Sequence, residues 1–364
     1  MRNRKKRKET EIMSKDYWNE RDDKTLERIN ELLDNLPDFI GEYENHISDS
    51  TAALTREHYI RDITQFFDYI CKELKYSSRY DVTIQTLSEL SVRFLDSYSK
   101  HLSNHNAKGE STVMKKTTKC RRLSAVRSLY QYLYDTDQIP QNQMQKIRTP
   151  KLDEEEIIRL EDDEVDDLLD AITSGKGTEL SKRAKSYNEI QSLRDVTIVS
   201  MLLNTGMRVS ELVGLDIDDL DLKRFSVRII GKGHENYSTL YYNNDLRELL
   251  MHYLTYRNRI EDVKEGSEKA LFLSSRKSRI GVRAVEKLVK KYSERAEIRK
   301  ISPHKLRSTY GTKLYSETRD IKAVADALNH KSISTTSRRY VSSSKEVRKA
   351  NRDKVNYTHE IHTE

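Results

Sequence analysis

Apolar residues recur at intervals of three and four along most of this chain, and only four prolines interrupt its 364 residues. Such spacing places the apolar side chains of a segment on one face of an α-helix. Stripes of this kind predict helices over about residues 26–36, 87–102 and 111–135. The clearest stripe consists of Tyr59, Ile63, Phe66, Phe67, Ile70 and Leu74. We therefore expect a mainly helical fold whose first part is an all-helical domain.

The length of the chain allows two domains, each with its own core. Pro150 bars helix continuation and precedes a switch from basic to acidic residues, which predicts a linker over residues 146–158. Residues 1–19 begin with a basic run and predict a disordered tail, and a charged tail ends the chain at 343–364. The two expected domains are therefore residues 20–145 and 159–342.

The second expected domain mixes helical and strand patterns. A helix is expected from Asp162, and the polar, glycine-containing residues 173–190 predict a long exposed loop. Residues 225–230 and 237–242 alternate between polar and apolar side chains, which is typical of strands, and a glycine-lysine-glycine turn between them predicts a hairpin. We expect an α+β domain with a small antiparallel sheet to follow the all-helical one.

Charge is distributed unevenly in this basic chain, which has 66 Lys and Arg residues against 59 Asp and Glu residues. A net charge of +7 is weak evidence for any partner, and local clusters are more informative. A basic cluster near the start of the helix expected at 111–135 consists of Lys115, Lys116, Lys119, Arg121 and Arg122. This cluster is either a solvated helix face or a contact to the DNA backbone.

Several classes of protein are disfavoured by the sequence. No apolar stretch approaches the length needed to span a bilayer, and the basic N-terminus lacks the apolar region of a signal peptide. Cys71 and Cys120 fall in helical patterns and are expected to be core thiols in a reducing compartment. Neither a zinc-binding spacing nor a glycine-rich phosphate loop occurs. We therefore expect a soluble cytoplasmic protein with no membrane partner, no metal and no cofactor.

The chain also carries side chains suited to phosphodiester chemistry without a metal. Such chemistry needs cations for the non-bridging oxygens, a nucleophile, a proton acceptor and a proton donor. Arg208 follows a turn at Gly206 and shares a helix face with Glu211, which can orient its guanidinium. Lys232 lies between two glycines, which permit close approach to another molecule. Taken singly, these residues are better explained as a surface ion pair and a solvated hairpin lysine.

Further candidates lie toward the C-terminus. A serine-proline pair is typical of a helix start and places His304 and Arg307 in the first two turns, where the positive helix end attracts anions. His330 follows Asn329, a residue type that often ends a helix in the left-handed conformation. Tyr340 follows a helix-start signal by about a turn and a half. The simpler alternatives are a capping or buried histidine, a loop histidine and one of 21 tyrosines.

Taken in order, these motifs closely resemble those of the tyrosine recombinase (phage-integrase) family. The ordered set is TGMRVSEL, then GKG between strands, then HKLRSTYGT, then LNHKSISTT, then a tyrosine. The resemblance covers residues 158–342 well. It extends more loosely to the first half, where TTKCRRLSAVRSLYQYL resembles the last helix of the family's core-binding domain. It implies a Xer-like pair of domains, core-binding and catalytic, that clamp duplex DNA.

The resemblance also implies a role for each candidate in the catalytic half. Arg208 and Arg307 would hold the non-bridging oxygens of the scissile phosphate, and Glu211 would support Arg208. Lys232 would protonate the 5′ leaving oxygen. His304 would accept or share the proton of the nucleophile.

The covalent step would belong to the last two candidates. His330 would hydrogen bond to the phosphate, and Tyr340 would form a 3′-phosphotyrosyl bond. That bond stores the energy of the broken phosphodiester, so the strands can be rejoined without ATP or a metal.

The sequence departs from the family pattern in three places. Asn329 stands where the family usually has glycine, and NYSTLYYNN replaces a strand that is commonly rich in Lys and Arg. One extra residue separates Thr336 from Tyr340, which rotates a helical side chain by about 100°. We still prefer Tyr340 as the nucleophile, with Tyr310 as the second choice and Tyr315 as the third.

The resemblance implies a site-specific DNA recombinase that works as a homotetramer, a dimer on each inverted-repeat site, through a Holliday junction. Residues 343–364 are candidates for docking on a neighbouring subunit, and an accessory DNA-bending protein or a partner recombinase is a further expected partner. Resolution of chromosome dimers and integration or excision of a mobile element remain open. Two alternatives are DNA relaxation of the type IB topoisomerase kind and a catalytically silent DNA-binding protein.

Overall fold

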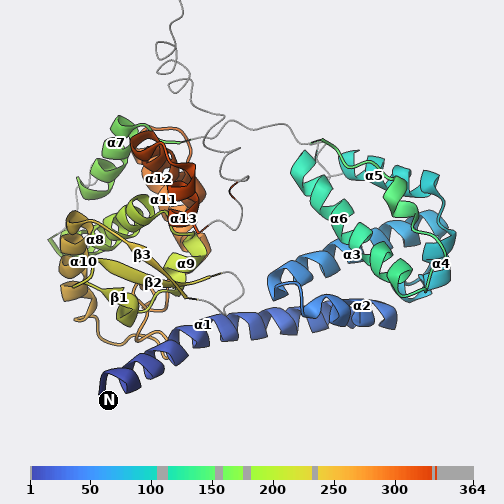
Figure 1. The fold of residues 1–364 in the computed structure, drawn as a ribbon, viewed down its shortest axis with the longest axis horizontal. Helices are drawn as coiled ribbons and strands as arrows, with labels where there is room; N and C mark the ends of the chain where they lie inside the picture. The colour runs from blue at the N-terminus through green and yellow to red at the C-terminus, as the bar shows by residue number, and fades with distance from the viewer. Residues whose placement is uncertain are drawn as a thin grey trace, which may run out of the picture. The chain divides into compact units, whose positions relative to one another are not determined.

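The computed structural model describes residues 2–104, 114–151, 159–174, 182–231 and 237–329, together with Ile333. Within these ranges, side chains are described except at 2–16, 104 and 182–190. The chain divides into two compact units (Figure 1). The first unit comprises residues 16–154, and the second comprises 155–364 together with 1–15. Each unit has its own hydrophobic core.

The first unit is entirely helical in its described part. Its helices are the part of α1 (Arg2–Leu33) from Asp16 onward, α2 (Asp38–Ser48), α3 (Ala53–Leu74), α4 (Ile84–Glu89), α5 (Val92–Asn104) and α6 (Lys116–Asp135), with 3-10 turns at Arg79–Asp81 and Gln143–Lys146. The apolar stripe predicted on α3 faces the core, where Phe66 and Phe67 are fully buried with Tyr98 of α5 and Tyr130 of α6. The hydroxyl of Tyr130 donates to the carbonyl of Leu87 at 2.9 Å, which fixes α6 against α4.

Two features of the first half of the chain differ from the sequence-based expectation. Helix α1 begins at Arg2, where we expected a disordered tail over 1–19; no proline or glycine interrupts the helix-forming residues from there to Leu33. The single helix expected over 87–102 is split into α4 and α5. The break occurs because Leu90 is extended and the hydroxyl of Ser91 accepts the backbone N–H of Phe94 at 3.2 Å, as a helix N-cap does.

The second unit packs helices around a three-stranded sheet. Its elements are α7 (Asp162–Thr173), α8 (Lys182–Thr205), α9 (Val209–Gly214), a 3-10 turn (Ile217–Asp219), β1 (Leu220–Asp221), β2 (Ser226–Ile230), β3 (Tyr237–Tyr241), α10 (Asn244–Arg257), α11 (Val282–Arg295), α12 (Pro303–Thr318) and α13 (Ile321–Ala327). The strand order is β1-β2-β3, and all pairs are antiparallel. The predicted fold class, mainly α with a small antiparallel sheet, is confirmed.

Helix α8 contacts α7, α10 and α12 and thereby organises the second unit. Ile198, Val199 and Leu202 on α8 are fully buried, because this helix is covered on several sides. The loop predicted over 173–190 is wrong from Lys182 onward, where α8 begins. No proline or glycine occurs between Lys182 and Thr205, so the helix extends well before its apolar segment.

Among the helices that the structure describes, none combines the length and the apolar composition that crossing a membrane requires.

Asp219 is the one carboxyl group among the described residues of the second unit whose pKa is raised strongly. It is 4% exposed, and its Oδ2 accepts the backbone N–H of Asp216 at 2.9 Å. Burial raises the pKa of Asp219 from 3.8 to about 6, and the neighbouring charge of Asp216 acts in the same direction. The folded protein therefore keeps this proton at pH values where the unfolded chain has lost it.

We predict that Asp219→Asn removes a pH-dependent cost of folding. Because the pKa of Asp219 is higher in the folded state, its contribution to the free energy of unfolding falls as pH rises from about 4 to about 6 and is constant above that. The neutral amide of the variant makes no such pH-dependent contribution. The free energy of unfolding of the variant should therefore rise relative to that of wild type between about pH 4 and pH 6, by at most about 3 kcal/mol. Urea unfolding at several pH values measures the difference. A difference that does not change with pH contradicts the prediction.

Candidate active site

The turn between α8 and α9 requires glycine for two reasons. Gly206 has a φ of +62°, which confirms the predicted left-handed end of α8. A Cβ on Gly206 would lie 2.3 Å from Cδ1 of Tyr310 and 2.9 Å from Cδ2 of Leu328. The turn thus packs tightly against α12 and the end of α13, and any side chain would push these elements apart.

Arg208, two residues after this turn, is oriented by a buried carboxylate. Its guanidinium Nη1 donates to Oε1 of Glu211 at 2.6 Å, and its backbone N–H donates to Oε2 of the same carboxylate at 2.6 Å. The Glu211 side chain is 5% exposed, whereas that of Arg208 is 39% exposed. The predicted pairing is therefore present, and the arginine keeps access to solvent and to an incoming anion.

Arg307 joins three elements through its side chain. It lies on α12 and is 4% exposed. Its Nη1 donates to the carbonyl of Gly206 at 2.5 Å, and its Nη2 donates to the carbonyl of Leu328. The sequence-predicted cations Arg208 and Arg307 are thus brought to the same turn, since the carbonyl that holds one lies two residues before the other.

His304 lies one turn before Arg307 at the start of α12. Pro303 is the first residue of this helix, as the sequence predicts, and follows the extended Ser302. The side chain of His304 is exposed, whereas that of Arg307 is buried. The histidine is therefore accessible at the helix N-terminus, which is the position predicted for it.

Helix α13 is followed by a left-handed stop. Asn329 has a φ of +48°, which confirms the conformation predicted for it. Its side-chain amide Nδ2 donates to Oγ of Ser238 on β3 at 2.9 Å. The sequence offered no signal for Ser238. Three predicted site residues, Lys232, His330 and Tyr340, lie outside the described residues, and their roles stay predictions.

Tyr310, the second choice for the nucleophile, is half-buried next to Gly206. Its ring contributes to a small apolar cluster with Val324 and Leu328. Burial raises the pKa of Tyr310, and the charge of Arg307 acts in the opposite direction. These contacts give Tyr310 a packing function and support the preference for Tyr340.

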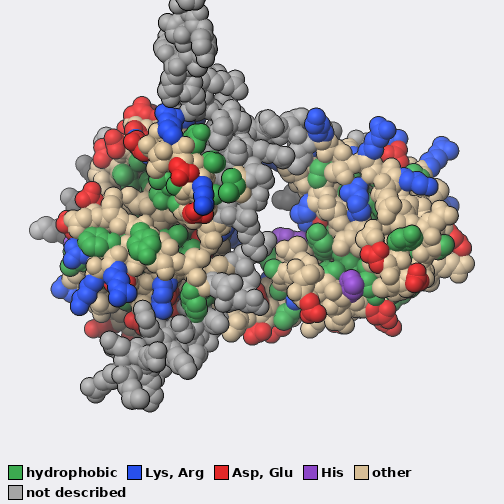
Figure 2. Space-filling model, in the orientation of Figure 1, with side chains coloured by type: hydrophobic (Ala, Val, Ile, Leu, Met, Phe, Trp, Pro, Cys, Tyr) green, Lys and Arg blue, Asp and Glu red, His purple; other side chains and the backbone are tan. Residues whose placement is uncertain are grey.

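The basic cluster on α6 is partly engaged within its own unit. Nη1 of Arg121 lies 2.5 Å from Oδ2 of Asp62, which is 1% exposed, and Nε of Arg122 lies 3.9 Å from Oδ1. Lys119 donates to Oγ of Ser103 on α5 at 2.8 Å. Lys115 and Lys116 are exposed, like many of the Lys and Arg side chains visible in Figure 2. These two lysines and the half-exposed Arg121 are therefore the most accessible members of the cluster.

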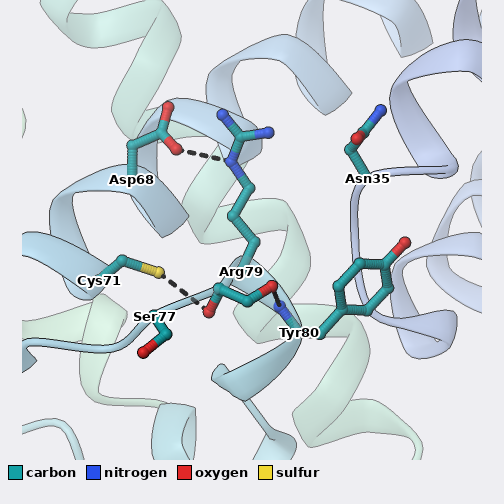
Figure 3. Close-up of a pocket in the computed structure, with 7 residues that line it drawn as sticks. Asn35, Asp68, Cys71, Ser77, Arg79 and Tyr80 are labelled. Carbon is teal, nitrogen blue, oxygen red and sulfur yellow. Dashed lines mark hydrogen bonds and ion pairs between the residues drawn. The ribbon is translucent and has the colours of Figure 1, made fainter.

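A shallow hollow of about 320 Å³ lies in the first unit (Figure 3). Its lining includes Asp68, Cys71, Arg79 and Tyr80. Arg79 pairs with Asp68 at 2.6 Å, and the thiol of Cys71 donates to the carbonyl of Ser78 at 3.4 Å. Because these polar groups bind one another and fix the segment after α3, we assign the hollow a structural role.

Neither cysteines nor clustered acids form a metal site in the described ranges. Cys71 and Cys120 are free thiols that are half-buried, rather than the core residues we expected. Within the residues that the structure describes, no group of three His, Cys, Asp or Glu side chains is arranged to hold a metal ion.

Comparison with known sequences identifies relatives along most of the chain. A sequence model of the phage integrase family matches residues 159–347. The tyrosine recombinase XerS of Streptococcus thermophilus (strain CNRZ 1066) is 32% identical over 336 residues, which cover 85% of this chain and 93% of that protein.

Comparison with solved structures finds the same architecture. The XerH site-specific recombinase bound to its difH substrate, in a pre-cleavage complex, matches with a TM-score of 0.58 and 22% identity over 84% of this chain and 81% of that one. The Tn1549 transposon integrase in complex with transposon right end DNA matches with a TM-score of 0.61 and 18% identity over 87% and 98% of the chains. At these identities the likeness concerns the fold.

We predict that Gly206→Ala destabilises the second unit by at least about 2 kcal/mol, because a left-handed φ and a clash with the Tyr310 ring both oppose a side chain. Gly281→Ala is the matched control, since Gly281 has a φ of −99° and nothing lies within 4 Å of the position that a Cβ would take there. The control should change stability by less than about 1 kcal/mol. Denaturant unfolding measures the free energy of unfolding of both variants. Equal losses of stability in the two would contradict the prediction.

Proposed function

This chain belongs to the phage integrase family, and from that premise we infer that it is a site-specific DNA recombinase of the Xer type. It cuts and rejoins duplex DNA through a covalent bond between a tyrosine and a 3′-phosphate. The observation that carries the proposal is that Arg307 binds the carbonyl of Gly206, two residues before Arg208. Two guanidinium groups held near one turn suit the two non-bridging oxygens of a phosphodiester.

We propose the following sequence of bond changes. The hydroxyl oxygen of Tyr340 attacks the scissile phosphorus and gives up its proton, which His304 accepts or shares. The P–O5′ bond breaks, and Lys232 supplies the proton that the leaving oxygen requires. Arg208, Arg307 and His330 bind the phosphate during the exchange. Reversal of these steps with the 5′-hydroxyl of another strand completes the transfer, so no external energy source is needed.

The proposed domain roles follow the same division of the chain. Residues 20–145 would be the core-binding domain, joined by the linker 146–158 to a catalytic domain at 159–342. Basic side chains at the start of α6 support a contact to the DNA backbone, which fixes position without reading sequence. The related XerH and Tn1549 integrase structures contain DNA. They support duplex DNA as the partner, and we propose a dimer on each site.

We further propose that two such dimers form a homotetramer on two inverted-repeat sites, where the C-terminal tail 343–364 docks on a neighbour. The setting would be the cytoplasm, at the nucleoid. The relatives named XerS and XerH support a Xer-type role. Chromosome-dimer resolution and mobile-element integration use the same chemistry, and the DNA beside the gene distinguishes them.

The nucleophile can be tested with a nicked suicide substrate that carries the inverted repeat found beside the gene. Wild-type protein should accumulate a covalent protein–DNA adduct, because the nick releases the 5′ fragment and prevents rejoining. Tyr340→Phe should form no adduct, and Tyr310→Phe should retain adduct formation. The adduct is measured by its shift on a denaturing gel.

The other outcomes of this experiment have definite meanings. An adduct that persists in Tyr340→Phe and is lost in Tyr310→Phe would identify Tyr310 as the nucleophile. Specific binding without any adduct from the wild-type protein would indicate the catalytically silent alternative, which the extra residue before Tyr340 favours. Relaxation of supercoiled plasmid without recombination would indicate a topoisomerase.

We predict that Lys232→Ala leaves DNA binding nearly unchanged and slows cleavage by about 10²–10⁴-fold, the usual contribution of a general acid. A filter-binding or gel-shift assay measures the affinity, and adduct formation over time measures the rate. Loss of affinity at an unchanged rate of cleavage from the bound state would instead make Lys232 a backbone contact.

A further inference from the structure

The hydrogen bond between Asn329 and Ser238 connects two segments that are far apart in the sequence. Nδ2 of Asn329 lies 2.9 Å from Oγ of Ser238. The Asn329 end of this contact is well anchored, because the backbone N–H of Asn329 donates to the carbonyl of Asp326 at 3.0 Å and Arg307 holds the carbonyl of Leu328. The contact depends on the asparagine side chain, which the glycine usual at this position in the family would lack.

The Ser238 end lies at the base of the predicted catalytic hairpin. Ser238 is the second residue of β3 and pairs with Ile229 of β2, which is 2% exposed. The next pair is Ile230 with Tyr237. Lys232 follows Ile230 by two residues in the sequence. His330 directly follows Asn329. The contact therefore joins the two chain segments that lead to Lys232 and His330.

We propose that Asn329 is a positioning residue whose hydrogen bond to Ser238 holds the Lys232 hairpin at the turn that carries His330. The inference rests on the proposed function and deepens it. Two of the parts of the chain that contribute to the proposed site are the β2–β3 hairpin and the end of α13. One hydrogen bond between them fixes where the proton donor of Lys232 lies relative to the phosphate held by Arg307 and His330.

The experiment compares two versions of the nicked substrate. The oxygen substrate has an ordinary scissile phosphate, and the sulfur substrate has sulfur in place of the bridging 5′-oxygen. Cleavage of the second breaks a P–S bond and releases a thiolate, which needs no proton, so a defect in proton donation disappears. The variants are Asn329→Gly, which keeps the left-handed backbone and removes the amide, Ser238→Ala, and the two combined. Thr239→Ala, at an exposed position of the same strand, is the matched control.

Each single variant should cleave the oxygen substrate about 3–10-fold more slowly than wild type, with unchanged DNA affinity. The double variant should be no slower than either single one, since both remove the same bond. Wild-type rates should return on the sulfur substrate, as they should for Lys232→Ala. Asn329→Asp should retain much of the rate, because Ser238 can donate to its carboxylate. The control should cleave both substrates at the wild-type rate.

Three outcomes would overturn the inference alone while the proposed function stands. In the first, Asn329→Gly still cleaves the sulfur substrate slowly although Lys232→Ala is rescued on it. In the second, the losses of cleavage rate in the two single variants add in the double variant. In the third, neither single variant cleaves more slowly than wild type. A wild-type protein that forms no adduct, or a Lys232→Ala that the sulfur substrate does not rescue, would overturn the assigned chemistry and the inference with it.

Discussion

The second unit depends on the hydrogen bonds that the buried guanidinium of Arg307 donates to two backbone carbonyls. A buried cation is costly unless its hydrogen-bond donors are satisfied. Both carbonyls that Arg307 contacts lie at helix ends: Gly206 follows the last residue of α8, and Leu328 is the C-cap of α13. Carbonyls at such ends have no partner within the helix and carry partial negative charge. Arg307 therefore satisfies two helix ends, and they in turn stabilise its charge.

Because of this arrangement, the backbone at Gly206 must meet three structural requirements at once. It must be left-handed to end α8, free of a side chain to accept the Tyr310 ring, and oriented so that its carbonyl reaches Arg307. Arg208 follows Gly206 by two residues, so the direction of its side chain depends on the same turn and on the buried Glu211. A change in any of these contacts would therefore shift the positions of both arginines that we propose to bind the phosphate.

The sequence predicted what depends on local spacing. The helical stripes, the β2–β3 hairpin strands, the left-handed Gly206 and Asn329, and the Arg208–Glu211 pair all involve residues at most a few positions apart. It could not predict contacts such as Arg121–Asp62 and Asn329–Ser238, because they join residues 59 and 91 positions apart. Helices α1 and α8 begin earlier than expected. A polar composition predicts disorder or a loop, but it is equally compatible with a solvent-facing helix.

Both units orient an arginine with a buried acid. Glu211 is 5% exposed and holds Arg208, whose side chain is 39% exposed; Asp62 is 1% exposed and holds Arg121, at 42%. Burial raises the pKa of Asp62, and the arginine charges act against this. A buried carboxylate that fixes a half-exposed guanidinium reduces the side-chain freedom lost when a phosphate binds. The pairing of Arg121 is therefore compatible with DNA contact, because the acid that neutralises part of its charge also holds its side chain in one orientation.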